Sequence, residues 1–493
     1  MRESGILMHI TSLPGRYGVG TMGKQAFSFV NFLHEAGQRC WQILPLTPTG
    51  YGDSPYQSYS AYAGNHYLID LEQLVQAGLL EQEEIDSIDW GDRDDRVDFG
   101  RLYQNRLRVL YLAYERFSEN DDFLQFTAEN AHWLPDFTLY MALKDRFDGK
   151  PWYEWEDGFK FRHPKTMEDA AAELRTQMRF YCFVQYLFFK QWSALRRYAH
   201  ENGVSIIGDV PIYVPYDSVE VWSAPHWFQL NEDLTPSAVA GCPPDAFTED
   251  GQLWGNPLYR WDEMKADGYS WWLSRLAAAG RLYDVVRLDH FRGFESYWSV
   301  PFGDLTARNG HWVKGPGLDF INVVKTKLPQ LKLIAEDLGF LTKEVFDMRD
   351  DSGLPGMKVL QFAFDSREPS EYLPYRYPTN SVCYTGTHDN MTTRQWLETA
   401  SADARAYAVE YMALNEQEGL VWGVIRTAMS SVSERCIVPM QDYLNLGAEA
   451  RMNFPGTQTG ENWTWRACAG FTGNGLSEKI YHLTKLYGRL GEQ

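Results

Sequence analysis

Four acidic residues at the ends of short apolar runs could do chemistry together. Asp209 lies at the end of "VSIIGDV", Asp289 in "DVVRLDH", Glu336 in "LKLIAEDLG" and Asp389 in "SVCYTGTHD". A single acid at such a position is commonly a helix cap or a solvated strand end, but four are hard to explain as caps. Several carboxyl groups without a thiol or a metal suit glycosyl transfer, which uses one ionised carboxylate as nucleophile and one protonated carboxyl as general acid.

Neighbouring residues suggest a role for three of these acids. Arg287 and Asp289 are two positions apart, so both point to one face of a strand, where a guanidinium would stabilise the carboxylate of a nucleophile. Glu336 ends an apolar strand, and burial there would raise its pKa, as a general acid requires. In "GTHDN", His388 and Asp389 can bind sugar hydroxyls, and Asp389 can steady an oxocarbenium-like charge. His388 by itself is equally compatible with a structural histidine.

A glycine-rich stretch near the start resembles a nucleotide-binding loop but lacks its other features. Gly18, Gly20 and Gly23 spell G-x-G-x-x-G, and Lys24 follows. Seven residues separate the preceding strand from the loop, and Gln25 replaces the Ser or Thr of a P-loop. The stretch that begins at Cys40, where a ribose-binding acid would be expected, has no carboxylate until Asp53. The stretch therefore predicts a turn, or a loop at a barrel mouth near a ligand without phosphate.

Eight apolar runs must position these residues. Four of them carry the acids, and helix candidates lie between most of them, which indicates an α/β fold and, with eight units, a closed (β/α)8 TIM barrel. The strand ends of such a barrel converge on one face, so distant acids can share a pocket. The runs span residues 5–11, 40–46, 204–210, 284–290, 331–339, 357–365, 381–389 and 435–443.

The spacing of the runs predicts large, mainly helical insertions in a single catalytic domain over 1–493. The stretches after the second and third runs far exceed the dozen residues that a crossover needs, so we expect insertion subdomains at about 68–203 and 211–282 over the barrel mouth. We also expect a helix from Lys24 to Ala36, and one long helix or two joined helices from Met167 to Asn202.

Composition excludes several classes of partner and location for this protein. The 493 residues carry a net charge of −20 without dense Lys/Arg clusters, which argues against a nucleic-acid partner. The most apolar run, 180–189, is too short for a bilayer span, so we expect no membrane association. No signal peptide, C-x-x-C motif or zinc-type His pair is present, which favours a cytoplasmic protein with reduced thiols and no metal. Aromatic residues make up 15% of the chain and could stack on sugars.

Several long motifs resemble the amylomaltases, the 4-α-glucanotransferases or disproportionating enzymes of glycoside hydrolase family 77, relatives of the α-amylases. They are "SLPGRYGVG", "WQILPLTPTGYGDSPYQSYSAYAGN", "GDVPIYV", "GQLWGNPLY", "RLDHFRGF", "AEDLG", "THDN" and "EARMNFPGT", in the expected order along nearly the whole chain. The resemblance implies a (β/α)8 barrel without a separate C-terminal β-domain. It also implies transfer of α-1,4-glucan segments between maltooligosaccharides, without a cofactor, a metal or a nucleotide.

The resemblance assigns roles residue by residue. Asp289 would be the nucleophile, Glu336 the acid/base and Asp389 the transition-state stabiliser, with support from Arg287 and His388. The implied substrate contacts are Asp209, Ser54 and Tyr56 (donor side), Gln252 and Trp254 (acceptor side), and Asn453 and Pro455 (a second rim loop). One departure is Ala246, where members of the family often have a larger or aromatic residue, so acceptor contacts at that position stay in question.

Three alternatives remain at this point. An α-amylase-type hydrolase would use the same three carboxylates, because residue spacing does not distinguish water from a sugar as acceptor. A glycan-binding protein without activity would usually lack a catalytic acid, and a nucleotide-binding protein would need a complete phosphate loop.

Overall fold

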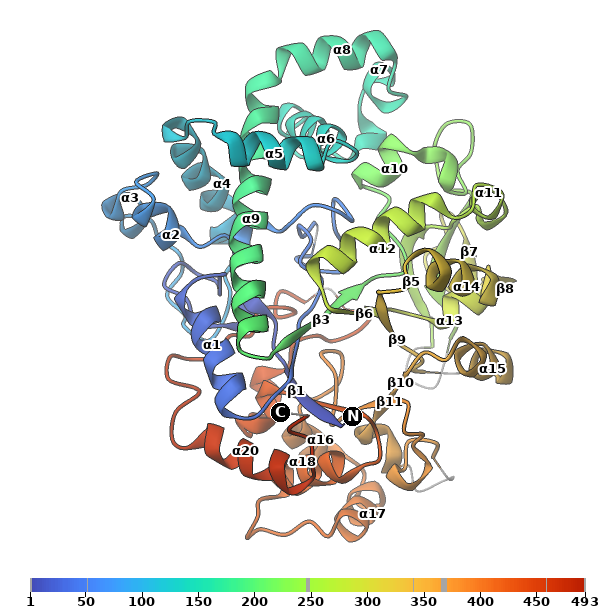
Figure 1. The fold of residues 1–493 in the computed structure, drawn as a ribbon. Helices are drawn as coiled ribbons and strands as arrows, with labels where there is room; N and C mark the ends of the chain where they lie inside the picture. Colours follow the sequence, from blue (N-terminus) through green and yellow to red (C-terminus); the bar gives the residue numbers. More distant parts are fainter. Residues whose placement is uncertain are drawn as a thin grey trace.

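Eight parallel strands close into a barrel in the computed structural model (Figure 1), which describes residues 2–50, 52–244, 249–339, 341–364, 370–457 and 459–491. Each strand coincides with or overlaps one of the eight apolar runs, which confirms the predicted (β/α)8 barrel. The strands are β1 (Glu3–Leu7), β2 (Cys40–Gln42), β3 (Ser205–Val210), β6 (Val285–Leu288), β9 (Lys332–Ala335), β10 (Gly356–Val359), β11 (Ser381–Tyr384) and β12 (Arg435–Pro439). Ala246 lies outside the described residues.

The barrel strands follow one another around the barrel in chain order, and β12 closes it by pairing with β1. Strands β6, β10 and β11 are buried at every residue, because helices cover the barrel outside and side chains fill it inside. Most neighbouring strands share three to five matched residue pairs, whereas β9 and β10 share one, Gly356 with Ala335. Strands β9 and β10 are therefore connected by fewer matched residue pairs than the other neighbouring strands of the barrel.

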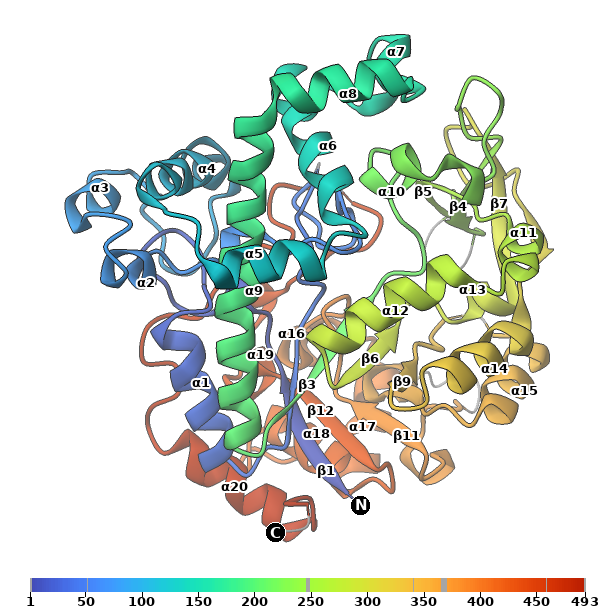
Figure 2. The ribbon, with the colours of Figure 1, turned by 45° about the horizontal axis from the view of Figure 1, so that its top comes forward.

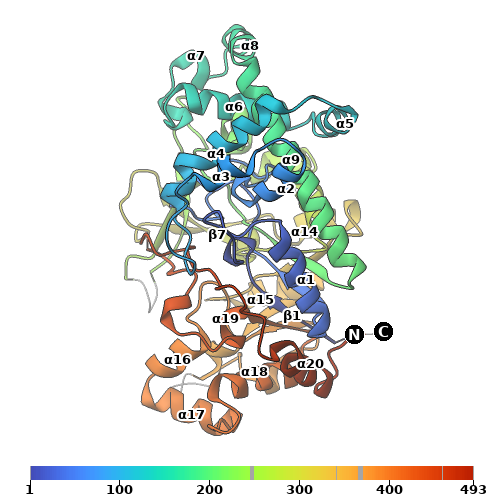
Figure 3. The same cartoon turned by 90° about the vertical axis from the view of Figure 1, so that its left-hand side faces the viewer.

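The segment 68–203, which we propose as an insertion subdomain, is helical in the structure (Figures 1 and 3). Much of it stands above the barrel, whereas its last helix, α9, runs down along the side of the barrel and contacts β3. Its apolar run 180–189 lies within α9 and is almost wholly buried, as expected for a core-facing helix. The predicted helix from Met167 to Asn202 is two helices joined at Leu174, α8 and α9. The helices are α2 (Leu71–Gln76), α3 (Gln82–Asp86), α4 (Phe99–Arg116), α5 (Asp121–Glu129), α6 (Leu134–Arg146), α7 (Asp157–Lys160), α8 (Pro164–Glu173) and α9 (Arg175–Glu201).

The segment 211–282, our second proposed subdomain, combines short helices with part of a small sheet that sequence analysis did not identify. This antiparallel sheet has the order β5-β4-β7-β8, and two of its strands come after β6, outside the segment (Figure 2). The elements are α10 (Val219–Ser223), β4 (Ala238–Cys242), β5 (Gln252–Pro257), α11 (Trp261–Ala266), α12 (Ser270–Leu282), β7 (Ser296–Pro301) and β8 (His311–Lys314).

The remaining helices surround the second half of the barrel, and both chain ends lie together at its base (Figure 3). Glu3 in β1 pairs with Leu490, and the described residues after β12 form no further sheet. These helices are α13 (Arg292–Glu295), α14 (Gly317–Lys327), α15 (Lys343–Ser352), α16 (Thr393–Thr399), α17 (Ala402–Met412), α18 (Leu420–Ser430), α19 (Met440–Tyr443) and α20 (Leu476–Leu486). None of the helices in the described ranges has the length and apolar character that crossing a bilayer requires.

The glycine-rich stretch packs against protein groups at the start of α1 (Lys24–Glu35), which matches the predicted helix. A Cβ on Gly20 would collide with the carbonyl of Ile10, and one on Gly23 with the carboxylate of Asp70. Asp70 also accepts a hydrogen bond from the Thr21 hydroxyl at 2.6 Å. A protein carboxylate thus occupies the space next to the helix N-terminus, where a nucleotide phosphate would otherwise bind. The stretch does not line the large cavity described below.

Candidate active site

A cavity of about 860 Å³ opens at the carboxyl ends of the barrel strands. Its volume is within the range of ligand pockets, and its position is the one that (β/α)8 enzymes use for catalysis. Eleven of the twelve predicted site residues line it: Asp289, Glu336, Asp389, Arg287, His388, Ser54, Tyr56, Gln252, Trp254, Asn453 and Pro455. The barrel therefore brings together residues that lie about 400 positions apart in the chain.

Arg287 lines this cavity and forms ion pairs with two carboxylates, those of Asp289 and Asp209. Its guanidinium lies 2.9 Å from Asp289 Oδ1, as the two-residue spacing predicted, and 2.6 Å from Asp209 Oδ2 on the neighbouring strand β3. The Arg287 side chain is buried, and although burial lowers its pKa, Asp209 and Asp289 outweigh this and raise the pKa well above its ordinary value. A permanent cation therefore stands beside the predicted nucleophile.

Asp209 is the one predicted contact that does not line the large cavity. It is 3% exposed and lies behind Tyr56 and Arg287, where Oδ2 accepts hydrogen bonds from both. Burial raises its pKa to about 6, although Arg287 opposes this. Asp209 instead lines a separate cavity of about 40 Å³ with Arg275 and Tyr283, which has room for water but not for a sugar. The structure thus gives Asp209 contacts with the residues that line the site.

Backbone groups from two strand ends hold Glu336. The amide of His290 donates to Glu336 Oε2 at 2.7 Å, and the amide of Leu338 donates to Oε1 at 3.1 Å. His290 reaches this position with φ of 48°, a left-handed conformation that is uncommon for a residue other than glycine. Burial and the charge of Asp289 raise the pKa of Glu336 well above its ordinary value, against the opposing effect of Arg287. The expected pKa rise from burial is confirmed.

The surroundings of Asp389 lower its pKa, whereas those of Glu336 raise the pKa of Glu336. The Asp389 carboxylate accepts a hydrogen bond from Asn453 Nδ2 at 2.6 Å and lies 3.2 Å from His388 Nε2. Burial would raise the pKa of Asp389, but His388, Asn453 and Arg287 outweigh burial and hold the pKa well below its ordinary value. Two carboxyl groups in one cavity therefore have pKa values shifted in opposite directions, a pattern that marks sites of acid–base chemistry.

Tyr56 connects the two sides of the site. Its hydroxyl lies 2.7 Å from Asp209 Oδ2 and 2.9 Å from His388 Nε2, and its ring stacks on the imidazole of His388 at 5.3 Å between centroids. The hydroxyl of Ser54 accepts a hydrogen bond from the Tyr56 amide at 3.2 Å. Ser54 thus stabilises the turn that presents Tyr56.

Trp254 packs against His290, the residue that follows Asp289. Its ring meets the His290 imidazole edge to face, with centroids 4.9 Å apart, and approaches Tyr213 at 6.3 Å. The indole N–H donates to Gln252 Oε1 at 3.1 Å within β5. Gln252 therefore holds an aromatic side chain that is half-buried at the cavity wall.

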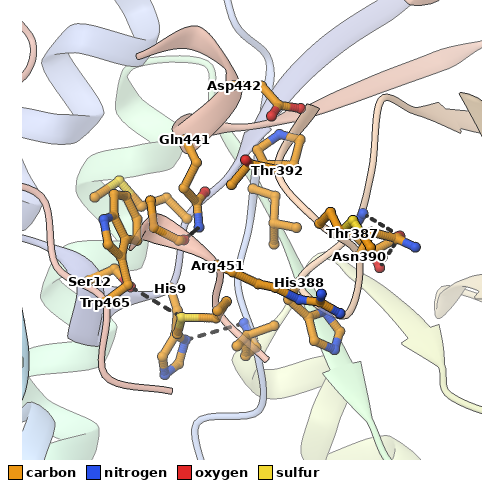
Figure 4. Close-up of a pocket in the computed structure, with 17 residues that line it drawn as sticks. His9, Ser12, Thr387, His388, Asn390, Thr392, Gln441, Asp442, Arg451 and Trp465 are labelled. Carbon is orange, nitrogen blue, oxygen red and sulfur yellow. Dashed lines mark hydrogen bonds between the residues drawn. The ribbon is translucent and has the colours of Figure 1, made fainter. Parts of the chain in front are cut away.

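A second cavity, of about 30 Å³, lies behind His388 (Figure 4). His9, Ser12 and Trp465 lie toward one end of it, and Thr387, His388 and Asn390 toward the other. His9 Nδ1 accepts a hydrogen bond from the Leu44 amide, so the neutral ring carries its proton on Nε2. Burial lowers the pKa of His9 to about 3. The space suits one or two water molecules.

Sequence reasoning missed three aromatic residues that line the large cavity, Tyr213, Phe362 and Trp463. Tyr213 follows β3 by three residues, so attention to strand ends would have found it. Trp463 lies in a loop after β12 with φ of 67° and has no local sequence signal. Within the described ranges, no group of three or more His, Cys, Asp or Glu side chains is arranged to hold a metal ion.

Comparisons with known proteins agree with this site. The sequence model of the 4-alpha-glucanotransferase family matches residues 8–470. The chain is 48% identical over 486 residues to a 4-alpha-glucanotransferase of Clostridium butyricum, covering 98% of this chain and all of the relative. It is 47% identical over 482 residues to one of Thermus thermophilus, covering 95% of both chains.

Solved structures agree with the sequence comparisons. The amylomaltase of Streptococcus agalactiae in complex with acarbose superposes with a TM-score of 0.96, with 40% identity and coverage of 99% of this chain and all of that one. The amylomaltase of Corynebacterium glutamicum, at 19% identity and a TM-score of 0.79, has the same fold over 99% of this chain and 75% of its own. The chain belongs to the 4-alpha-glucanotransferase family, glycoside hydrolase family 77, and is an enzyme of glucan transfer.

Proposed function

We propose that this enzyme transfers α-1,4-glucan segments between maltooligosaccharides by a retaining double displacement at the large cavity. The observation that carries this proposal is the pairing of Asp289 and Glu336 at the ends of the adjacent strands β6 and β9. Asp289 lies 2.9 Å from a permanent cation, whereas burial favours the protonated form of Glu336. A nucleophile and a general acid need these two opposite states.

In the first step, the carboxyl proton of Glu336 moves to the glycosidic oxygen as the bond between that oxygen and the anomeric carbon breaks. A carboxylate oxygen of Asp289 forms a bond to the anomeric carbon, and the shortened glucan leaves with a free 4-hydroxyl. Asp389, held by Asn453, would stabilise the positive charge that develops on the sugar ring.

In the second step, the Glu336 carboxylate takes the proton of an acceptor's 4-hydroxyl as that oxygen attacks the anomeric carbon. The ester bond to Asp289 breaks, and both carboxyl groups return to their starting states. Two inversions give net retention of configuration. We place the acceptor against Trp254 and Gln252, and the donor against Tyr56 and Ser54.

A solved relative and the aromatic residues of the cavity support this substrate class. The Streptococcus agalactiae amylomaltase was solved with acarbose, and that structure has the same fold over its whole length. Aromatic rings of Tyr56, Tyr213, Trp254 and Trp463 line the cavity, and such rings stack on the apolar faces of sugars. We also propose a cytoplasmic location, which cell fractionation would test.

The covalent intermediate gives the sharpest test. In the Glu336→Gln variant, an α-maltotriosyl fluoride donor should still react, because fluoride leaves without a proton from an acid. The glycosyl enzyme should then accumulate, and mass spectrometry of peptides should place the added mass on Asp289. The wild-type enzyme should convert maltotriose into a ladder of longer glucans plus glucose. Adduct on another residue, or inverted anomeric configuration in the product, contradicts the mechanism; shortened products without a ladder contradict transfer.

A further inference from the structure

The joint between β9 and β10 lies directly beside Glu336 and is built in an unusual way. These two barrel strands share one matched pair, Gly356 with Ala335, where other neighbours share at least three. The amide of Ala335 donates to the carbonyl of Pro355 at 2.9 Å. In such a parallel pair, the amide of Met357 is the next donor toward β9.

The side chain of Asp337 reaches this amide in addition to the backbone pairing of Gly356 with Ala335. It is 2% exposed, and Oδ1 accepts a hydrogen bond from the Met357 amide at 2.6 Å. Gly356 leaves room for it, because a Cβ at that position would lie 2.5 Å from Asp337 Oδ2. A buried carboxylate therefore ties the segment that carries Glu336, just after β9, to the neighbouring strand β10.

A buried cation holds this carboxylate in place. Arg349 in α15 donates from NH1 to Asp337 Oδ2 at 2.6 Å. The same guanidinium donates from Nε and NH2 to Asp350 Oδ1 at 2.9 and 2.7 Å, but the Asp350 side chain is 66% exposed. The buried Asp337–Arg349 pair is thus the inner part of a three-residue ion network, and its loss would leave an uncompensated charge.

Consecutive residues of an extended chain point to opposite sides, so fixing one of them fixes the other. Glu336 points into the cavity, and Asp337 points to α15 and β10. We propose that Asp337, held by Arg349, is a positioning residue that keeps the Glu336 carboxyl aimed at the glycosidic oxygen. This inference rests on the proposed role of Glu336 as acid/base.

The charges around Glu336 make the proposal measurable. Arg287 and Asp289 face it from the end of β6, the His290 amide donates to it, and the Asp337 charge lies behind it with Arg349 and Lys358. After burial and Asp289, the charge of Asp337 also raises the pKa of Glu336. Removing that charge should lower this pKa, so activity that needs the protonated acid should be lost at a lower pH.

The test compares Asp337→Asn with a matched control, Asp350→Asn. Asp337→Asn keeps an oxygen for the Met357 amide but removes the charge that pairs with Arg349. With maltotriose as donor, we expect kcat to fall about 10- to 100-fold, with KM changed less than about 2-fold, as for loss of an interaction made in the transition state. The alkaline limb of the pH profile should move to lower pH. Asp350→Asn should keep the wild-type kcat and pH profile.

The leaving group separates positioning from general structural damage. With α-maltotriosyl fluoride, whose departure needs no acid, Asp337→Asn should form the glycosyl enzyme at close to the wild-type rate. Equal losses on both donors, or an unchanged kcat with maltotriose, would overturn the inference. If Asp337→Asn does not fold, Arg349→Lys should show the same donor-dependent loss in a weaker form, and an equal loss on both donors would count against it. Failure of Glu336→Gln to react with the fluoride would instead contradict the proposed function.

Discussion

Asp209 connects the two halves of the catalytic cavity without lining it. One path of contacts leads from Asp209 through Arg287 to Asp289, and the other through Tyr56 to His388 and Asp389. The motif "GDVPIYV" predicted that Asp209 matters, but its side-chain surroundings depend on Tyr56, which is 153 residues away. The sequence therefore predicted the correct strand end. Only the packing shows that Tyr56 and Arg287 lie between Asp209 and the cavity.

The hydroxyl of Tyr56 offers a test at this scale. Tyr56→Phe keeps the ring that stacks on His388 but leaves Asp209 and His388 without their shared hydrogen-bond partner. An unsatisfied buried group costs about 1–3 kcal/mol, so we expect kcat/KM on maltotriose to fall about 10- to 100-fold. Tyr56→Ala should lose more activity, because it also removes the ring. Equal activities of the Phe variant and the wild type would show that the hydroxyl is not needed.

At the scale of elements, the prediction of strands succeeded where burial was complete. The barrel strands are apolar on both faces, so their runs stand out in the sequence. The small sheet escaped notice because its strands are not runs of large apolar residues. β4 reads "AVAGC", which is apolar but small, with a register shift beside Gly241; β5 reads "QLWGNP", and β8 is largely exposed. Glycine and proline are depleted in strands, so these segments resemble loops.

Strand β5 carries Trp254, which we expect to favour sugar over water as acceptor. Trp254→Ala removes the ring beside His290 and should raise the ratio of hydrolysis to transfer about 10-fold, because the acceptor loses a stacking surface worth about 1 kcal/mol or more while water does not. Released glucose and longer glucans, measured together during reaction with maltotriose, give this ratio.

Two further variants test whether the aromatic ring of Trp254 is the feature that favours transfer. Trp254→Phe keeps an aromatic surface and should stay near the wild-type ratio. Gln252→Ala keeps the ring but removes the amide side chain that accepts from the indole N–H and that we place against the acceptor. Its ratio should therefore fall between those of Trp254→Phe and Trp254→Ala. If Trp254→Ala leaves the ratio unchanged, acceptor selection lies elsewhere in the cavity.

The turn before α1 can be tested through the stability of the protein. Gly23→Ala would place a methyl group against the Asp70 carboxylate, which also caps α2 through the Gln73 amide. Overpacking of this kind costs about 1–3 kcal/mol, so the melting temperature should fall. Gly460→Ala is a matched control, because nothing lies within 4 Å of the added methyl and its φ is not positive. Similar melting temperatures for the two variants would contradict the tight packing at Gly23.

For the whole molecule, chain organisation was more predictable than the packing of its parts. The number of apolar runs predicted the eight barrel strands, and the long gaps between runs are the basis on which we propose the two insertion subdomains. The contact of Asp337 with Met357, or of Asn453 with Asp389, depends on how strands stagger around the closed barrel. Period and composition carry no information on that stagger, so such pairs emerge only from the three-dimensional structure.

Buried histidines should make the folded molecule sensitive to acid. The His9 side chain is 7% exposed, and burial lowers its pKa from about 6.5 to about 3. Between these pH values the unfolded chain binds a proton that the folded protein does not, so the contribution of His9 to stability is present above pH 6.5 and lost as the pH falls. At pH 5 this loss amounts to about 2 kcal/mol.

The variant His9→Asn isolates this effect, because Asn does not titrate and its side-chain oxygen can still accept from the Leu44 amide. Other groups titrate in both proteins, so the difference between their unfolding free energies reports His9 alone. The variant should be less stable than the wild type at pH 7.5, because it leaves part of the imidazole's space empty. Relative to the wild type, it should then gain about 2 kcal/mol when the pH is lowered to 5. Denaturant unfolding at the two pH values measures this difference, and a difference that does not change with pH would mean that His9 takes up its proton as readily in the folded protein as in the unfolded chain.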